Sequence, residues 1–169
     1  GVGVSCVNAL SIKMKVEVFR NGNIYCQEYS KGKPQGPLQI TGKSEDRGTK
    51  VTFLPDPEIF SVTTFSFDTL ANRLRELAFL NKGIRIELKD QRSGESESFH
   101  YEGGIKSYVE HINEKKEPLH EAIDLKGEKD GISVEIAMQY NAGFSSNIFS
   151  FANNINTYEG GTHESGFKT

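Results

Sequence analysis

Residues 15–29 read KVEVFRNGNIYCQEY, and this stretch carries the pattern of a β-hairpin. Charged and apolar residues alternate before Asn21-Gly22, as they do in a strand with one buried face. Asn-Gly between two such runs favours a tight antiparallel turn, because both residues accept positive φ angles. Further strands are predicted at 38–41 and 50–54, before Pro55-Asp56-Pro57 interrupts the sheet.

Helices alternate with groups of strands along the rest of the chain. Apolar residues at helical spacing predict a strongly amphipathic helix that begins at Ser66-Phe67 and ends at Lys82-Gly83. The other expected elements are a helix at 4–10, a Gly/Pro loop at 31–37, strands at 84–88 and 98–101, a helix at 105–112, strands at 122–125, 132–140 and 147–153, and a last helix that Thr162 caps. This order, with mostly antiparallel hairpins, predicts an α+β fold rather than a doubly wound one.

The composition limits the classes of function. The chain has 169 residues and a net charge of −3, with interleaved acids and bases that give no support for DNA binding by this segment itself. Cys6 and Cys26 are too few for a disulfide framework or a zinc site, which predicts two reduced thiols. No histidines have zinc-ligand spacing, and no apolar run approaches the ~20 residues of a membrane helix. We therefore expect a cytoplasmic protein with no metal ligands and no membrane contact.

Two short patterns are candidates for ligand binding. Gly1-x-Gly3 at a helix start presents backbone N–H groups to an anion, and glycine lets a phosphate approach without meeting a Cβ. The alternative is plain packing or capping of the helix. Thr49 follows Gly48 at the start of a strand, where its hydroxyl could point into a pocket, or where it serves only as a β-branched strand residue. The residues alone thus support an α+β domain with a candidate anion-binding helix start.

Four longer blocks carry a family resemblance. They are GVGVSCVNALS at 1–11, RLRELAFL at 73–80, HYEGGI at 100–105 and NNINTYEGGTH at 153–163. In this order they resemble the ATP-driving subunits of bacterial type II DNA topoisomerases, the DNA gyrase B family foremost. The resemblance implies a partial GHKL (Bergerat-type) ATPase sandwich of antiparallel sheet and helices at 1–103. It implies the start of a transducer domain, similar to domain 2 of ribosomal protein S5, at 104–169.

The resemblance also implies a nucleotide site. The last part of the family's glycine-rich lid matches Gly1, Val2, Gly3, Val4 and Ser5, whose N–H groups would meet the phosphates of ATP.

The remaining implied site residues lie on the predicted strands. Thr49 would join the adenine-recognition network through water, and Val51 would line the adenine pocket. Arg20 would lie at the pocket mouth, where aminocoumarin-type inhibitors also bind.

Some parts of the family's machinery match nothing in this sequence. The family's glutamate base, the asparagine that holds Mg²⁺ and the aspartate that reads adenine precede the position of Gly1, and the transducer lysine follows that of Thr169. We therefore expect an internal fragment with no catalytic residue, which binds ATP weakly, does not hydrolyse it and has marginal stability.

For the longer protein, the resemblance implies ATP with Mg²⁺, ATP-dependent homodimerisation, DNA, and a breakage-reunion subunit of the gyrase A type as partners. Its activity would be ATP-driven strand passage with negative supercoiling. Two alternatives stay open: the corresponding ATPase subunit of topoisomerase IV, which decatenates DNA, and a non-enzymatic GHKL-like nucleotide-binding protein. A topoisomerase ATPase subunit and a non-enzymatic GHKL-like protein would both place Gly1 and Thr49 near a nucleotide. Only the topoisomerase subunit requires the family's glutamate, asparagine and lysine.

Overall fold

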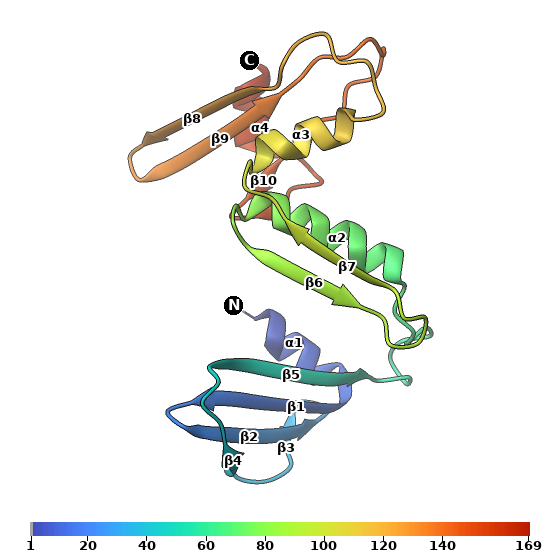
Figure 1. Cartoon of the computed structure of the whole chain (residues 1–169), viewed down its shortest axis with the longest axis vertical. Coiled ribbons are helices and arrows are strands. Elements are labelled where there is room, and N and C mark those ends of the chain that lie inside the picture. The colour runs from blue at the N-terminus through green and yellow to red at the C-terminus, as the bar shows by residue number, and fades with distance from the viewer. Residues whose placement is uncertain (1) are drawn as a thin grey trace. The chain divides into compact units, whose positions relative to one another are not determined.

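The computed structural model describes residues 2–169 and consists of two compact units, Gly1–Thr64 and Phe65–Thr169. Most of the elements are labelled in Figure 1. The first unit contains one helix and a five-stranded sheet, and the second contains three helices and three two-stranded sheets. All strand pairs are antiparallel. The predicted α+β class is confirmed.

The sheet of the first unit is organised around β1 (Ser11–Arg20), which pairs with β2 (Asn23–Ser30) on one side and β5 (Gly48–Pro55) on the other. The turn between β1 and β2 has positive φ angles at Asn21 and Gly22, 53° and 74°, as the Asn-Gly pattern predicts. Two further strands pair with β2 at its other edge, β3 (Lys33–Pro34) and β4 (Gln39–Lys43). The predicted loop at 31–37 therefore contains a short strand.

The helix of the first unit, α1 (Gly3–Ala9), leads directly into β1 and contacts β1, β2 and β5. None of its own residues is buried. The buried groups lie at its C-terminal end, where Ser11 and Met14 are each 1% exposed. The helix is therefore held mainly where it joins the sheet.

The second unit has its core between α2 (Phe67–Leu80) and the hairpin of β6 (Arg85–Lys89) and β7 (Ser96–His100). The Ser66 side chain accepts a hydrogen bond from the Thr69 N–H, which confirms the predicted helix start. The core combines small and large apolar side chains: Ala71, Ala78 and Phe99 are buried, and Phe67, Leu74, Ile86, Leu88 and Tyr101 pack against them.

The remaining elements of the second unit are α3 (Ile105–Asn113), β8 (Ile123–Lys129), β9 (Ile132–Met138), β10 (Phe151–Ala152), β11 (Ile155–Asn156) and α4 (Thr162–Lys168). The strand predicted at 147–153 is limited to Phe151–Ala152, and it ends there because Asn153 and Asn154 adopt positive φ angles and turn the chain back into β11. The prediction that Thr162 caps α4 is wrong, since Gly161 occupies the cap and Thr162 is the first helical residue. The predicted domain boundary at 103/104 lies inside the second unit and stays a prediction.

Candidate functional site

The sheet of the first unit brings three predicted site residues together on one face. Thr49 lies opposite Val18 across the β1–β5 ladder, and Val51 lies opposite Val16. Directly paired residues point to the same side of a sheet, and alternate residues of one strand share a face. Arg20 is two residues beyond Val18, so its side chain shares the face of Thr49 and Val51.

This face, which we call the uncharged face, carries no charged side chain of β1, β2 or β5 except that of Arg20. The residues of β1, β2 and β5 that alternate onto it are Met14, Val16, Val18, Arg20, Asn23, Tyr25, Gln27, Tyr29, Thr49, Val51 and Phe53. Arg20 is the one charged residue of this set, and it lies at the end of β1. A surface of apolar and neutral polar side chains with one cation at its edge suits a flat heteroaromatic ring that carries an anionic group.

The opposite face holds the charged residues of the same strands. Lys15 Nζ contacts Glu17 Oε1 at 2.8 Å, and Lys50 Nζ lies 3.8 Å from Glu17 Oε2. The hydrogen bond from Lys15 lowers the pKa of Glu17 below its ordinary value. These ion pairs show that the two faces of the sheet differ in chemistry.

The predicted set omits Val18 and Tyr25, which are paired across β1 and β2 on the uncharged face. Both are partly buried: Val18 lies directly opposite Thr49, and Tyr25 lies opposite Val18 on the next strand. The alternation of residues around Asn21-Gly22 is the signal from which they could be found, because the turn determines the register of the hairpin.

The start of α1 is open to solvent. Val2 is 76% exposed and Val4 62% exposed, and a Cβ added at Gly3 would meet no atom within 4 Å. The Cys6 N–H donates to the Val2 carbonyl at 3.0 Å, so the N–H groups of Gly3, Val4 and Ser5 precede the hydrogen-bonded ladder. No acidic side chain lies in this first turn. Gly1, the first residue of the predicted lid segment, lies outside the described residues.

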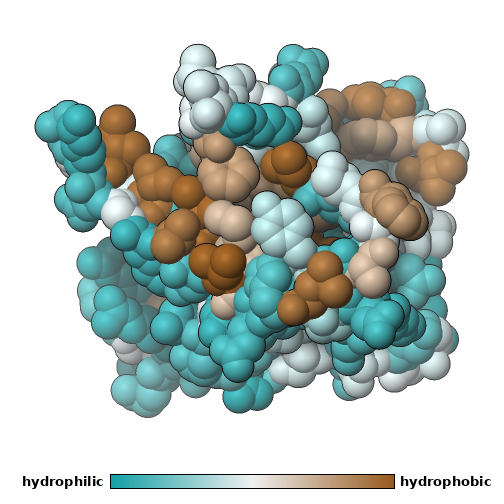
Figure 2. All heavy atoms as spheres, turned by 90° about the horizontal axis from the view of Figure 1, so that it is seen from above, coloured by the Kyte–Doolittle hydropathy of each residue, from teal (hydrophilic) through white to brown (hydrophobic). Residues whose placement is uncertain are grey.

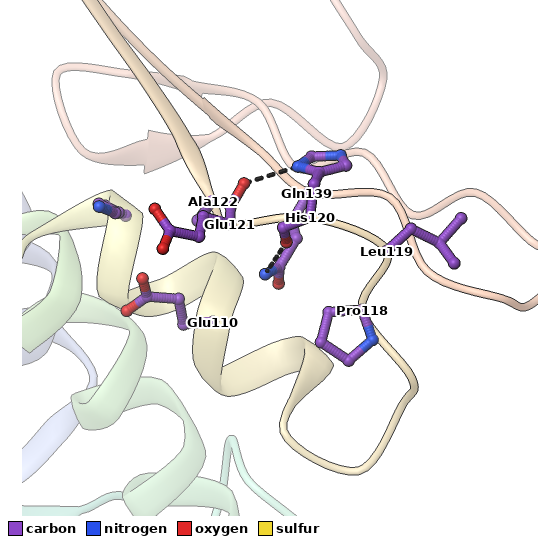
Figure 3. Close-up of a pocket in the computed structure, with 8 residues that line it drawn as sticks. Glu110, Pro118, Leu119, His120, Glu121, Ala122 and Gln139 are labelled. Atoms are coloured by element: carbon purple, nitrogen blue, oxygen red, sulfur yellow. Dashed lines mark hydrogen bonds between the residues drawn. The ribbon is translucent and has the colours of Figure 1, made fainter.

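The second unit contains a depression of about 560 Å³ that includes none of the predicted site residues. Its lining residues are Lys106, Glu110, Pro118, Leu119, His120, Glu121, Ala122 and Gln139 (Figure 3). Both ring nitrogens of His120 are occupied: Nδ1 lies 2.6 Å from the Glu121 carbonyl, and Nε2 accepts the Tyr140 N–H at 3.0 Å. The ring therefore connects backbone segments and is not free to act as a base.

Two negative findings apply to residues 2–169. No group of three or more His, Cys, Asp or Glu side chains is arranged to hold a metal ion. No helix in this range has the length and apolar character that crossing a bilayer requires.

Comparison with known proteins identifies relatives over the whole chain. The family model for DNA gyrase B matches residues 104–169. The DNA gyrase B protein of Halalkalibacterium halodurans is 60% identical over 172 residues, which cover all of this chain and 27% of the relative. The gyrase B protein of Bacillus mycoides is 55% identical, again over all of this chain and over 43% of the relative. The chain thus spans less than half of these curated relatives.

A solved structure shows the same fold. The 43K ATPase domain of Thermus thermophilus gyrase B, in complex with an aminocoumarin, superposes with a TM-score of 0.87 at 37% identity. The match covers 99% of this chain and 47% of that one. The gyrase B ATPase fold implied by the four sequence blocks is confirmed.

Proposed function

Because the chain belongs to the DNA gyrase B family, we propose that it forms part of the ATP-binding subunit of a type II DNA topoisomerase. The observation that carries the proposal is 60% identity to a gyrase B protein across the entire chain. The Halalkalibacterium and Bacillus relatives are gyrase rather than topoisomerase IV proteins, which favours negative supercoiling over decatenation.

ATP lies between the uncharged sheet face and the start of α1. The adenine ring packs on Val51, and Thr49 contributes its hydroxyl to the hydrogen bonds around the base. The phosphates meet the N–H groups of the lid segment Gly1–Ser5, at the positive end of the α1 dipole. Arg20 lies at the mouth of this site, where an aminocoumarin binds. The support comes from the shared face of Arg20, Thr49 and Val51 and from the unpaired first turn of α1.

Mg²⁺ would accompany the phosphates, but the described residues offer no cluster of metal ligands. In the longer protein, ATP drives closure of a homodimer, and a gyrase A-type partner passes DNA. Residues 104–169 begin the transducer domain, which agrees with a family-model match that begins at 104.

The nucleotide site is tested in the full-length protein with Thr49→Ala. Loss of one hydroxyl hydrogen bond, roughly 0.5–1.5 kcal/mol, raises the Kd for a non-hydrolysable ATP analogue by about 3- to 10-fold. Thr52→Ala is the matched control, because Thr52 lies on the same strand but pairs with Lys15 on the charged face. An equal rise in the Kd for both substitutions, or an unchanged Kd for Thr49→Ala, would contradict the proposal that adenine binds on the face that carries Thr49 and Val51. The overall activity is checked by ATP-dependent negative supercoiling of relaxed plasmid with a gyrase A-type partner.

A further inference from the structure

We propose that Asp56 and Lys31 are positioning residues for the nucleotide: their ion pair holds the C-terminal end of α1 and so sets where the segment Val2–Ser5 lies. The inference rests on the proposed function, in which this segment meets the phosphates of ATP. Asp56 follows the end of β5, whereas Thr49 lies at its start, and neither Asp56 nor Lys31 would touch the nucleotide.

Contacts within the first unit hold α1 at one end. The Ser11 hydroxyl, at the start of β1, donates to the Val7 carbonyl of α1 at 2.6 Å, and the Leu10 N–H completes the last turn of the helix by donating to the Cys6 carbonyl at 3.0 Å. Ser11 is only 1% exposed. The other end of the helix is open to solvent at Val2 and Gly3. The direction of α1 therefore depends on the junction at its C-terminal end.

Three segments meet at that junction. The Asp56 N–H, just after β5, donates to the Leu10 carbonyl at 3.0 Å. The Lys31 N–H, in the turn between β2 and β3, donates to the Ser11 carbonyl at 2.8 Å. Gly32 lies against the same helix end, since a Cβ placed there would be 3.4 Å from the Ala9 Cα, and its φ of +80° disfavours other residues.

The Asp56 carboxylate joins these segments through side-chain contacts. Its Oδ2 lies 3.0 Å from Lys31 Nζ, and its Oδ1 accepts the Glu58 N–H at 2.9 Å. The Asp56 side chain is 1% exposed, whereas Lys31 is 48% exposed. The Glu58 N–H first, and then Lys31, lower the pKa of Asp56 below its ordinary value. The carboxylate is therefore ionised at neutral pH, and the pair with Lys31 persists.

The length of the helix makes a small rotation matter. Seven residues at 1.5 Å each give α1 a length of about 10 Å. A tilt of about 10° at the junction would move the far end by about 2 Å, which is enough to break N–H···O bonds of about 2.9 Å to a phosphate. Loss of the Asp56–Lys31 pair should therefore weaken phosphate binding more than adenine binding.

Glu58 provides the matched control. It is the other carboxylate on Lys31, with Oε2 at 2.6 Å from Nζ, but its side chain is 78% exposed. An exposed ion pair of this kind contributes little to stability. Its removal leaves the buried contact between Lys31 and Asp56 in place.

The test uses the full-length protein and two ligands. One is a non-hydrolysable ATP analogue, which needs the phosphate contacts, and the other is an aminocoumarin, which has no phosphates. Asp56→Asn and Lys31→Met are expected to raise the Kd of the analogue by about tenfold and to leave the Kd of the aminocoumarin unchanged. Lys31→Arg, which keeps the cation, is expected to retain analogue binding, as is Glu58→Gln.

Each other outcome contradicts the proposal. An unchanged Kd for the analogue in Asp56→Asn shows that the pair does not position α1. A parallel loss of both ligands, with a lowered Tm, shows a merely structural role. If the wild-type protein binds the aminocoumarin but not the ATP analogue, the proposed function itself fails and the inference fails with it.

Discussion

At the scale of single residues, Asp90 and Arg92 illustrate how backbone and side-chain donors combine on one carboxylate. Asp90 follows β6, and its Oδ1 accepts both the Arg92 N–H at 2.8 Å and Arg92 Nε at 3.0 Å. The guanidinium also donates to the Phe65 carbonyl at 2.8 Å. Hydrogen bonds from the Arg92 side chain first, and then from its N–H, lower the pKa of Asp90 to about 2. This turn therefore depends on an ionised aspartate.

The pH dependence follows from the direction of that shift. Because the pKa falls from 3.8 in the unfolded reference to about 2, the stabilisation is complete above pH 3.8 and is lost as the pH falls through about 2. The carboxyl resonance of Asp90 in an NMR titration is expected to have its midpoint near 2. In Arg92→Gln the midpoint should rise toward 3.8. Arg85→Gln, in β6 and paired with His100, is the control and should leave the midpoint unchanged.

At the scale of secondary-structure elements, one aromatic side chain connects three segments of the second unit. Phe79, in the last turn of α2, is 1% exposed. Its ring stacks on Tyr101, after β7, with centroids 3.6 Å apart, and on Tyr108 of α3 at 5.1 Å. The partial burial of Tyr108 raises the pKa of its hydroxyl. The stack thus joins α2, the end of β7 and α3.

Removal of this ring should have a large energetic effect. Phe79→Ala is expected to lower the free energy of unfolding by about 3–5 kcal/mol, through lost burial and the cavity that remains. Phe144→Ala makes the same chemical change at a fully exposed position and should alter stability by less than about 0.5 kcal/mol. Denaturant unfolding of both variants measures the difference. If Phe79→Ala changes the free energy of unfolding by about as little as Phe144→Ala does, the aromatic stack contributes little to stability.

At the scale of the whole molecule, many apolar side chains are in contact with solvent. Among the described residues, the buried apolar ones are Met14, Cys26, Ala71, Ala78, Phe79, Phe99 and Ala122. Figure 2 shows apolar residues gathered between polar ones on one surface of the molecule. The hairpin of β8 and β9 has one apolar face, on which Leu125 is 50% and Val134 49% exposed. Lys126 and Glu135 form an ion pair on the other face of the hairpin.

This exposed surface predicts self-association of the isolated 169-residue chain. Leu125→Lys with Val134→Lys should weaken association by about tenfold or more, because burial of each side chain contributes about 1.5–3 kcal/mol. Asp124→Lys with Ser133→Lys adds lysines on the polar face and is the matched control. Sedimentation velocity over a range of concentrations distinguishes the variants. Equal association of the two double variants would show that the apolar face is not responsible.

Local chemistry allowed much of the fold to be predicted from the sequence. The hairpin turn at Asn21-Gly22 and the start of α2 after Ser66 depend on neighbouring residues, since φ preferences and helix capping act over two to four positions. The four sequence blocks likewise predicted the gyrase B ATPase fold. The predicted strand at 147–153 is longer than the observed one, Phe151–Ala152, and its pattern does not indicate the positive φ angles of Asn153 and Asn154 that end it.

The tertiary structure alone decided which distant residues share a surface. Arg20, Thr49 and Val51 lie on one face because β1 pairs with β5 in a register set across more than twenty intervening residues. Lys31 and Asp56 meet because that pairing brings the end of β5 to the end of α1. Alternation along a strand predicts which side chains of that strand share a face of the sheet. The partner strands determine which other residues lie on the same face. Long-range pairing is selected by the packing of the whole sheet, and no local pattern specifies it.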